Sequence, residues 1–346
     1  MLMPLPLASP HRRERFRSSP AKCVNPAHLL CTCNQVLLSL RYMKRDTGLA
    51  IGFVDFPQRY IHLRYWKATP QSTWAQGARS TGHGTIGSTM ADSVREFYKQ
   101  LVPNYEFIFP DWPASVRRQS EALDRLLGRY LRGDGPRAVL DCACGIGTQA
   151  IGLATRGYRV HATDISAEAI EYARQKASEL HADLTFGIAD FLKLDEAVFG
   201  TFDAVIALDN AVAHVQHESE LEQMLRSMSS KVEREGVLLL SLRDYDELAR
   251  TRPRTTTSVV TDGPEGRIIV FQVWDWKDDG SAYRLHHYTV RQRGEAWETS
   301  CAVCDLRAWQ RSDVGKAMKK AGLSFSWYMP EESGFYQPIV AAQRKL

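Results

Sequence analysis

The chain has 346 residues, of which 44% are hydrophobic and 24% charged, enough to bury one large core or two modest ones. No apolar run approaches the roughly 18–20 residues needed to span a bilayer, so we expect a soluble protein without a membrane partner. The net charge of +4 is unevenly placed: residues 1–89 hold 12 Lys and Arg against 3 Asp and Glu, and residues 90–346 hold 32 against 37. The mildly acidic main part argues against nucleic-acid binding.

The cysteine content indicates a reducing compartment. Seven cysteines in a chain of this length do not resemble a disulfide framework, and we therefore expect a cytoplasmic protein. A zinc site would need two ligand pairs at metal spacing, and the sequence offers no such combination, so no metal is predicted. The close pairs are Cys31 with Cys33, Cys142 with Cys144, and Cys301 with Cys304.

The first ninety residues differ in composition from the rest. The opening segment is rich in Arg and Pro, but its charges follow its apolar run, which is not the order of a secretory signal. Organellar transit peptides share this composition, and residues 69–89 form a Gly/Ser/Thr-rich, linker-like stretch. We expect residues 1–89 to be either a disordered extension, produced by the choice of an upstream start codon, or a cleaved leader. Residues 90–346 are expected to be the working domain.

Helices and strands alternate from about residue 114 to 242. Ser166 is expected to cap one helix, with Glu168 in the first turn where the helix dipole favours it. Such alternation predicts βαβ units and a mostly parallel sheet. The expected helices cover 114–130, a segment from about 148, the segment after 166, and 218–230; the expected strands are 138–141, 158–164, 184–190, 202–209 and 236–242.

The pattern changes after the fifth strand. Residues 267–300 are predicted to form antiparallel strands joined at Asp-Asp-Gly and Arg-Gly-Glu turns. A helix over 312–321, ended by Gly322, precedes a closing antiparallel hairpin. The predicted fold is therefore an α/β, Rossmann-like sheet with an inserted antiparallel β element at about 250–300.

Charged side chains follow the predicted strands at their carboxyl ends, where open α/β sheets bind ligands. Gly145-x-Gly147 follows the first strand and formally fits a dinucleotide fingerprint, so an NAD(P)-dependent oxidoreductase is one alternative. Asp141, however, precedes the turn and would repel a pyrophosphate. The strand-end residues are Asp141, Asp164, Asp190, Asp209 and Arg243.

S-adenosylmethionine fits these details better, because it combines an adenosine and a positive charge without phosphates. Asp164 stands near the spacing of a ribose-binding acid, and Asp190 suits the adenine amino group. The absence of a Gly-Lys-Ser/Thr sequence after the turn argues against a nucleoside triphosphate.

The stretch DCACGIG resembles the first motif of class I methyltransferases. The stretches FDAVIALDNAVAH, GVLLLSLRDYDEL, HHYTV and SVRRQSEALDRLLG resemble the glycine/sarcosine N-methyltransferase group, over about residues 95–345. This resemblance implies methyl transfer from S-adenosylmethionine to the nitrogen of a small-molecule amine, such as glycine, sarcosine or a related amino acid. A non-enzymatic S-adenosylmethionine-binding protein is the second alternative, and a homo-oligomer is left open.

The resemblance also implies a role for individual residues. Asn210, Arg243 and Tyr288 fall on the acceptor-positioning positions, and a guanidinium at Arg243 suits a carboxylate. Arg118 is implied for the carboxylate of the cofactor, Asp164 for its ribose, and Tyr105 with Trp112 for a lid. The implied cofactor residues are Tyr105, Trp112, Arg118, Asp141, Ala143, Gly145, Gly147, Asp164, Asp190, Phe191, Leu208 and His214.

The sequence also departs from this group. Asp209 replaces a glycine before Asn210, which favours an acceptor with a second cationic group, and SCAVCDL replaces expected tyrosines. Other interpretations remain open at three positions: Arg243 as a surface ion pair with Asp244 and Asp246, Tyr288 as a packing residue, and His214 as a buried structural histidine.

Overall fold

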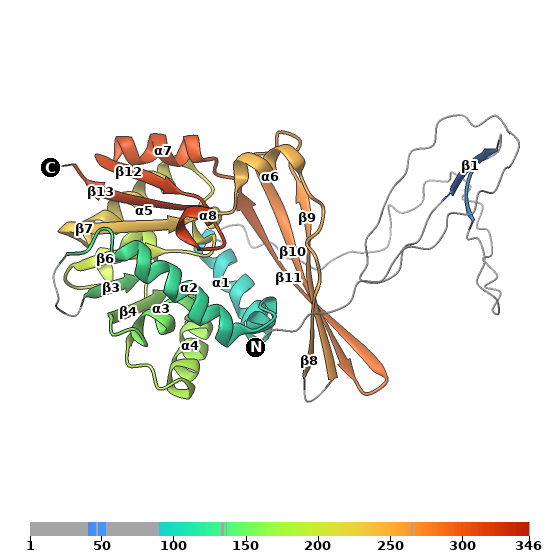
Figure 1. Cartoon of the computed structure of the whole chain (residues 1–346), viewed down its shortest axis with the longest axis horizontal. Helices are drawn as coiled ribbons and strands as arrows, with labels where there is room; N and C mark the ends of the chain where they lie inside the picture. Colours follow the sequence, from blue (N-terminus) through green and yellow to red (C-terminus); the bar gives the residue numbers. More distant parts are fainter. Residues whose placement is uncertain are drawn as a thin grey trace, which may run out of the picture. The chain divides into compact units, whose positions relative to one another are not determined.

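The computed structural model describes residues 41–45, 48–52, 90–132, 135, 137–263 and 266–345. The chain divides into two units, Met1–Ser80 and Thr81–Leu346. In the first unit, β1 (Arg41–Arg45) pairs antiparallel with β2 (Gly48–Gly52) (Figure 1). Apart from this hairpin, the segment 1–89 expected to be an extension or leader lies outside the described residues. In the described part of the chain, no helix has the length and apolar character needed to cross a membrane.

The second unit is built on a seven-stranded sheet with the order β12-β13-β7-β6-β3-β4-β5. The five central strands are parallel, and β13 runs antiparallel to both β7 and β12, which confirms the predicted sheet and its closing hairpin. The bounds are β3 (Ala138–Asp141), β4 (Arg159–Asp164), β5 (Thr185–Ile188), β6 (Phe202–Ala207), β7 (Val232–Ser241), β12 (Leu323–Tyr328) and β13 (Ile339–Arg344).

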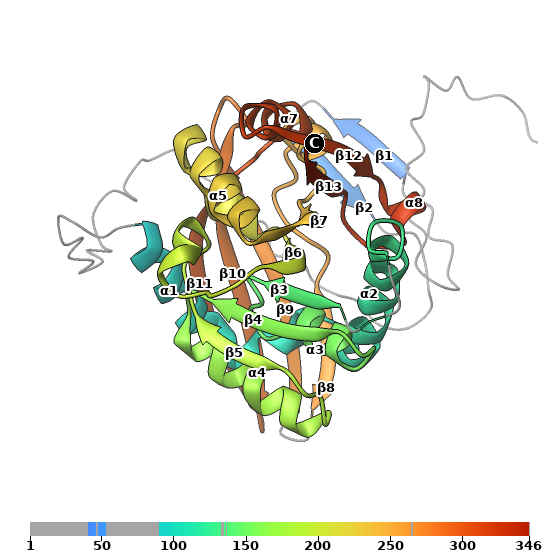
Figure 2. The ribbon, with the colours of Figure 1, turned by 90° about the vertical axis from the view of Figure 1, so that its left-hand side faces the viewer.

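Helices cover both faces of this sheet (Figure 2). Val139 packs with α2 (Trp112–Leu127), α3 (Thr148–Ala154) and α4 (Ala167–Glu179), whereas the next residue, Leu140, packs with α5 (Glu218–Ser230) and α7 (Arg311–Lys320). The side chains of Val139 and Leu140 are both fully buried, as expected for a strand covered on two sides. The Rossmann-like fold class predicted from the sequence is therefore confirmed.

The predicted cap of α4 is present. The Ser166 hydroxyl accepts the backbone N–H of Ala169 at 3.2 Å, and Glu168 lies in the first turn. The cap holds α4 at the carboxyl end of β4, directly after Asp164. The ligand-binding edge of the sheet is thus joined to a well-anchored helix.

Gly152 allows α2 and α3 to pack closely. A Cβ atom at this position would lie 2.7 Å from Ser120 Cβ and 2.9 Å from the Val116 carbonyl oxygen. We expect Gly152→Ala to lower the free energy of unfolding by about 1–3 kcal/mol, because one of the two helices must shift. Urea denaturation checks this. The matched control is Gly128→Ala, at a right-handed position (φ −59) with its nearest neighbour at 3.3 Å. An equal effect in both variants would contradict the packing argument.

A second, antiparallel sheet follows β7 in the chain, with the order β11-β10-β9-β8. It begins and ends later than the predicted 250–300, because α6 (Tyr245–Thr251) precedes it and β11 continues to Arg307. The turns predicted at Asp-Asp-Gly and Arg-Gly-Glu join its long strands. The bounds are β8 (Val259–Gly263), β9 (Gly266–Trp276), β10 (Ala282–Arg293) and β11 (Ala296–Arg307).

Short helical elements connect the two sheets at the carboxyl ends of the parallel strands. Helix α1 (Met90–Leu101) contacts β11 and α4, and the 3-10 helix η1 (Val102–Ile108) contacts β8, β9 and α4. The remaining elements are η2 (Phe191–Glu196), η3 (Ala211–His214) and α8 (Pro330–Ser333). The ligand-binding edge of the main sheet is therefore covered by residues from several distant parts of the sequence.

Candidate functional site

The glycine turn after β3 is held against the end of β4 by a carboxylate. Gly145 and Gly147 have φ angles of 52° and 84°, a left-handed conformation that glycine adopts without strain. Asp164 Oδ2 accepts the backbone N–H of Gly145 at 2.9 Å, and Asp164 Oδ1 accepts that of Ser166 at 2.9 Å. Each oxygen keeps a lone pair, so the carboxylate can still accept hydrogen bonds from the hydroxyls of a ribose.

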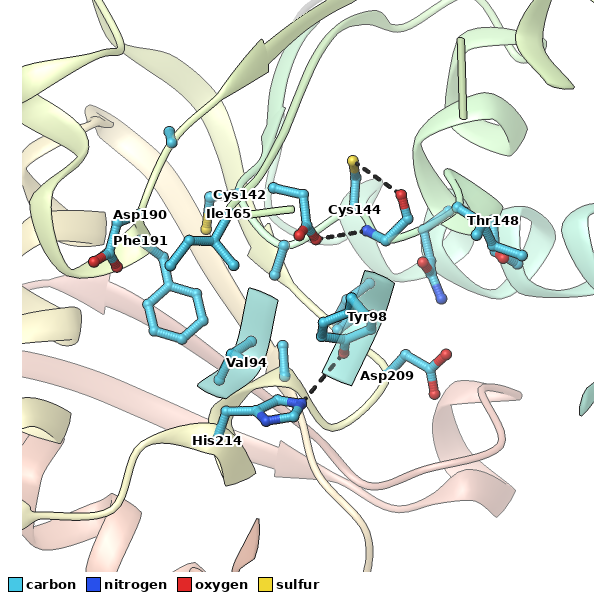
Figure 3. Close-up of a pocket in the computed structure, with 18 of the residues that line it drawn as sticks. Val94, Tyr98, Cys142, Cys144, Thr148, Ile165, Asp190, Phe191, Asp209 and His214 are labelled. Atoms are coloured by element: carbon cyan, nitrogen blue, oxygen red, sulfur yellow. Dashed lines mark hydrogen bonds between the residues drawn. The ribbon is translucent and has the colours of Figure 1, made fainter. Parts of the chain in front are cut away.

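A cavity, here called the cofactor cavity, lies above this turn (Figure 3). Its lining contains three carboxylates, and none of the described residues that line it is a Lys or Arg. Burial raises the pKa of Asp164, although its backbone hydrogen bonds oppose the shift. The lining residues predicted from the sequence are Tyr105, Ala143, Gly145, Asp164, Asp190, Phe191, Leu208 and His214.

This charge distribution selects among nucleotides. A diphosphate bound here would meet carboxylates without a compensating cation, which is costly at a partly desolvated site. A positively charged adenosine compound without phosphates would be attracted instead. The residues therefore fit S-adenosylmethionine, and they do not fit NAD(P).

The segment after β5 forms the end of the cavity for which the sequence predicts adenine binding. Asp190 Oδ1 accepts the backbone N–H of Leu192 at 2.9 Å, which leaves Oδ2 for a ligand. Phe191 and Ile165 extend into the same end of the cavity (Figure 3), and Leu208 also lines it. Ile165 was missed by sequence reasoning, although an apolar residue directly after Asp164 is in position to contact a flat base.

Two predicted cofactor residues, Asp141 and Gly147, do not line the cofactor cavity. Asp141 is 1% exposed, does not line the cavity, and accepts the Ala143 N–H at 3.4 Å. Burial raises its pKa to about 8, with the Ala143 hydrogen bond lowering it and Asp164 raising it. Gly147 also lies outside the lining; a Cβ there would come within 2.9 Å of the Ile151 side chain. Both residues shape the turn rather than its ligand-facing surface.

Of the two residues predicted to form a lid, only Tyr105 lines the cofactor cavity. The Tyr105 ring lies over the turn, since a Cβ on Gly145 would sit 3.5 Å from it. Trp112 is instead buried, donates its indole N–H to Thr148 Oγ1 at 2.9 Å, and lines neither cavity. The cofactor cavity has a volume of about 50 Å³, below the roughly 300 Å³ of typical ligand sites, so its lining must open further to admit an adenosine.

A second, larger cavity of about 410 Å³, here called the acceptor cavity, adjoins the first. Tyr98, Tyr105, Asp209 and His214 line both and therefore mark their junction. The lining of the acceptor cavity comes from α1, η1, α2, the loop after β6 with η3, the loop after β7, strands β9, β10 and β11, and the loop after α8. Its polar and charged lining includes Arg118, Asp209, Asn210, Arg243, Gln272, His287, Tyr336 and Gln337.

Arg243 enters this cavity and forms no ion pair with any residue that the structure describes. Its Nη1 donates to the Tyr283 hydroxyl at 2.6 Å, its Nη2 to Gln272 Oε1 at 3.3 Å, and its guanidinium lies 4.7 Å from the Trp274 ring centre. Burial lowers its pKa, but Tyr283 and Tyr245 raise it above the ordinary value, so the side chain stays protonated.

The alternative of a surface ion pair is wrong for Arg243. Arg311 occupies both neighbouring acids, with its Nη1 2.9 Å from Asp244 Oδ1 and its Nε 3.2 Å from Asp246 Oδ2. Among the described residues, none forms an ion pair with Arg243. A partly buried guanidinium of this kind favours a carboxylate ligand.

The other predicted acceptor residues are placed differently. Asn210 is 6% exposed, lines the acceptor cavity, and accepts the Arg243 backbone N–H at 3.1 Å. Tyr288 does not line either cavity and stacks on Phe271 at a centroid distance of 5.2 Å. Its neighbour His287 faces the acceptor cavity instead, because consecutive residues of a strand point to opposite sides.

Arg118 lies at the rim of the acceptor cavity, with an exposed side chain and a 3.0 Å hydrogen bond from its Nη2 to Ser115 Oγ. In the described part of the chain, no carboxylate pairs with it. The site therefore presents two guanidinium groups for carboxylates, one at the rim and one inside.

His214 is buried and neutral. Its Nε2 lies 3.2 Å from the Tyr98 hydroxyl, and Nδ1 has no hydrogen-bond partner among the described residues. Burial, and then the charge of Arg243, lowers its pKa to about 4. Tyr98, Gln272 and Tyr336 were missed by sequence reasoning, because they come from an N-terminal helix, the second sheet and the C-terminal loop.

The comparisons with known proteins all find methyltransferases among the similar proteins. Residues 139–236 match the family described as "Methyltransferase domain". The chain is 35% identical over 147 residues to glycine N-methyltransferase of Oryctolagus cuniculus, covering 39% of this chain and 50% of the relative. It is 32% identical over 138 residues to glycine/sarcosine N-methyltransferase of Parasynechococcus marenigrum, covering 40% and 48%. The chain thus spans about half the length of these curated relatives.

A solved structure supports the same fold over a longer range. An S-adenosylmethionine-dependent methyltransferase from Clostridium acetobutylicum superposes with a TM-score of 0.58 at 16% identity, covering 72% of this chain and 99% of that one. These matches confirm the resemblance predicted from the sequence, and they favour S-adenosylmethionine over NAD(P) as the nucleotide.

Proposed function

Because residues 139–236 form a methyltransferase domain within a class I S-adenosylmethionine-dependent methyltransferase fold, we propose that the chain methylates the nitrogen of a small-molecule amine. Glycine, sarcosine or a related amino acid is the proposed acceptor. The observation that carries this proposal is the pairing of two adjoining cavities with different charge. Among the described lining residues, the first cavity has carboxylates and no Lys or Arg, and the second has Arg243, which forms no ion pair with any described residue.

The acceptor class follows from the charges of the acceptor cavity. Arg243 offers a bidentate donor for a carboxylate, and Asp209 offers a negative group close to the junction with the cofactor cavity. An amino acid carries both complementary charges on adjacent carbon atoms. The curated relatives named for glycine and sarcosine point to the same class.

The residues at the junction suit the transfer of a methyl cation equivalent. Bound S-adenosylmethionine supplies an electrophilic methyl group on a positively charged sulfur. Tyr98 and Tyr105 surround the junction with aromatic faces and hydroxyl oxygens, and burial raises the pKa of both hydroxyls, so both stay neutral. Such groups tolerate a positive charge that disappears during the reaction without binding it too tightly. Arg243 and Asn210 would hold the acceptor in line, and positioning of this kind supplies much of the rate acceleration.

Calorimetry and a turnover assay test the proposal. We expect S-adenosylhomocysteine to bind and NAD(H) to give no heat, and we expect release of S-adenosylhomocysteine with at least one member of an amine panel that includes glycine and sarcosine. Heat with NAD(H) alone would overturn the methyltransferase assignment. Binding without turnover across the panel would favour a non-enzymatic cofactor-binding protein.

The same assay on a chain truncated to residues 90–346 tests our proposal that this segment is the working domain. Every described residue that lines either cavity lies between Val94 and Gln337. We therefore expect the truncated chain to remain soluble and to keep its turnover.

A further inference from the structure

Asp209 occupies the junction of the two cavities. It lines both of them, and it is the only carboxylate among the described residues that line the acceptor cavity. Figure 3 shows it beside Tyr98 and across from His214. The acceptor nitrogen must reach this junction to meet a methyl group, so a side chain at this place is within reach of the reacting atoms.

The backbone at this position is strained. Asp209 and Asn210 have φ angles of 53° and 69°, two successive left-handed residues that are not glycine. Such conformations cost free energy and persist where the surrounding structure and function retain them. The strained backbone is held by Ser241, whose Oγ accepts the Asp209 N–H at 2.8 Å and donates to Gln337 Oε1 at 2.9 Å.

The Asp209 carboxylate is oriented but not neutralised. The Tyr336 hydroxyl donates a hydrogen bond to Oδ1, and no described residue donates to Oδ2. Among the described residues, no cation lies within ion-pair distance of the Asp209 carboxylate, although the more distant charge of Arg243 lowers its pKa. Burial raises the pKa of Asp209, while the Tyr336 hydrogen bond and Arg243 partly oppose the shift.

The other candidate bases of the acceptor cavity are weak. Burial, followed by the charge of Arg243, lowers the pKa of both His214 and His287 to about 4. A histidine with so low a pKa has little tendency to take a proton from an ammonium group. Asp209 is the remaining anionic group in the cavity.

We infer that Asp209 is a catalytic residue that binds the ammonium group of the acceptor and removes its proton through Oδ2. This inference rests on the proposed methyl transfer to an amine. The proton passes from the acceptor nitrogen to Asp209. The freed lone pair then forms the N–C bond to the methyl group, while the electrons of the C–S bond remain on sulfur as S-adenosylhomocysteine. Asp209 releases its proton to solvent before the next turnover, so one proton is released overall.

The pH dependence of Asp209→Asn tests this role with the full chain. We expect kcat/KM at neutral pH to fall about 10²–10³-fold with the panel amine that turns over fastest, starting from glycine and sarcosine. The wild type should lose activity as the pH falls and Asp209 becomes protonated. The variant should instead gain about tenfold per pH unit up to the pKa of the amine itself, because only the neutral amine can then react. The described groups that line the acceptor cavity with Asp209 and titrate or carry charge are Tyr98, Tyr105, Arg118, His214, Arg243, His287, Cys304 and Tyr336.

Two further variants separate catalysis from folding. Asp209→Gly should lose activity similarly while its Tm stays equal or rises, because glycine relieves the left-handed strain. Asp183→Asn, at an exposed acid that lines neither cavity, should match the wild type in activity and Tm. S-adenosylhomocysteine affinity should change by less than about threefold in every variant.

The outcomes are distinguishable. Wild-type turnover combined with an unchanged rate and unchanged pH profile in Asp209→Asn would overturn the role of Asp209 and leave the proposed function intact. A parallel loss of activity at all pH values, with lowered Tm, would assign Asp209 a structural role and likewise overturn the inference. No turnover of any amine by the wild type would overturn both proposals.

Discussion

Asp164→Ala should weaken the binding of S-adenosylhomocysteine by about two to four orders of magnitude. The substitution removes the acceptor expected for the two ribose hydroxyls, and each hydrogen bond to a charged group contributes about 1.5–3 kcal/mol. It also leaves the N–H groups of Gly145 and Ser166, now held at 2.9 Å, without their acceptor, so the glycine turn loosens. Together these losses correspond to about a 10²–10⁴-fold rise in Kd, which isothermal titration calorimetry would measure.

The control for this variant is Asp183→Ala, which removes an exposed carboxylate from the loop between α4 and β5. It should bind S-adenosylhomocysteine as the wild type does. Circular dichroism must show that Asp164→Ala is folded. A folded Asp164→Ala protein with unchanged affinity would contradict the ribose assignment.

The strand-end carboxylates were predictable because parallel strands bring their carboxyl ends to one edge. Asp164 and Asp190 do line the cofactor cavity, as this rule requires. Asp141 obeys the same rule in sequence, yet its side chain is buried under the turn. The direction of a side chain at the point where a strand becomes a turn depends on backbone angles that residue spacing does not specify.

The second sheet was harder to predict at the level of single residues. Tyr288 and His287 are adjacent, and only one of them can face the acceptor cavity. Both faces of β10 carry polar residues, so the sequence pattern does not identify the inner face, and one residue of error exchanges the two sides. Resemblance pointed to Tyr288, whereas the structure places His287 in the lining.

Residues from distant elements were beyond prediction for a different reason. Gln272 and Tyr283 orient Arg243 from β9 and β10, and Tyr336 orients Asp209 from the loop after α8. No spacing rule links these positions to the residues that they contact. Their roles arise from the packing of the second sheet and the closing hairpin against the ends of β6 and β7.

The two cavities differ in the charges of their lining residues, and this difference explains how one site can bind two charged molecules, each in its own cavity. The cofactor cavity has carboxylates and no Lys or Arg among its described lining residues, so under the proposed function the carboxylate of S-adenosylmethionine would lie toward Arg118 at the rim of the acceptor cavity. Arg243, inside the acceptor cavity, would then bind the carboxylate of the acceptor. Asp209 at the junction then favours the nitrogen end of the acceptor on the side of the cofactor.

Arg243→Ala should raise the KM of the acceptor and lower kcat/KM by about 10²–10⁴-fold, because two hydrogen bonds from a charged group are lost. Arg243→Lys should show an intermediate defect, since an ammonium keeps the charge but lacks the planar pair of donors. S-adenosylhomocysteine affinity should stay within about threefold of the wild type. Steady-state kinetics over acceptor concentration and calorimetry with S-adenosylhomocysteine measure the two effects separately.

Arg250→Ala is the control, because Arg250 is 72% exposed on α6, a few residues beyond Arg243, and pairs only with the neighbouring Glu247 among the described residues. The pKa values of His214 and His287 provide an independent measurement. Burial, and to a smaller extent the charge of Arg243, lowers both pKa values to about 4. Their pKa values should rise in Arg243→Ala, which NMR titration of the imidazole protons would detect without any turnover. Equal loss of acceptor and cofactor affinity in Arg243→Ala would place Arg243 in the structural support of both cavities and contradict its role as the carboxylate ligand of the acceptor.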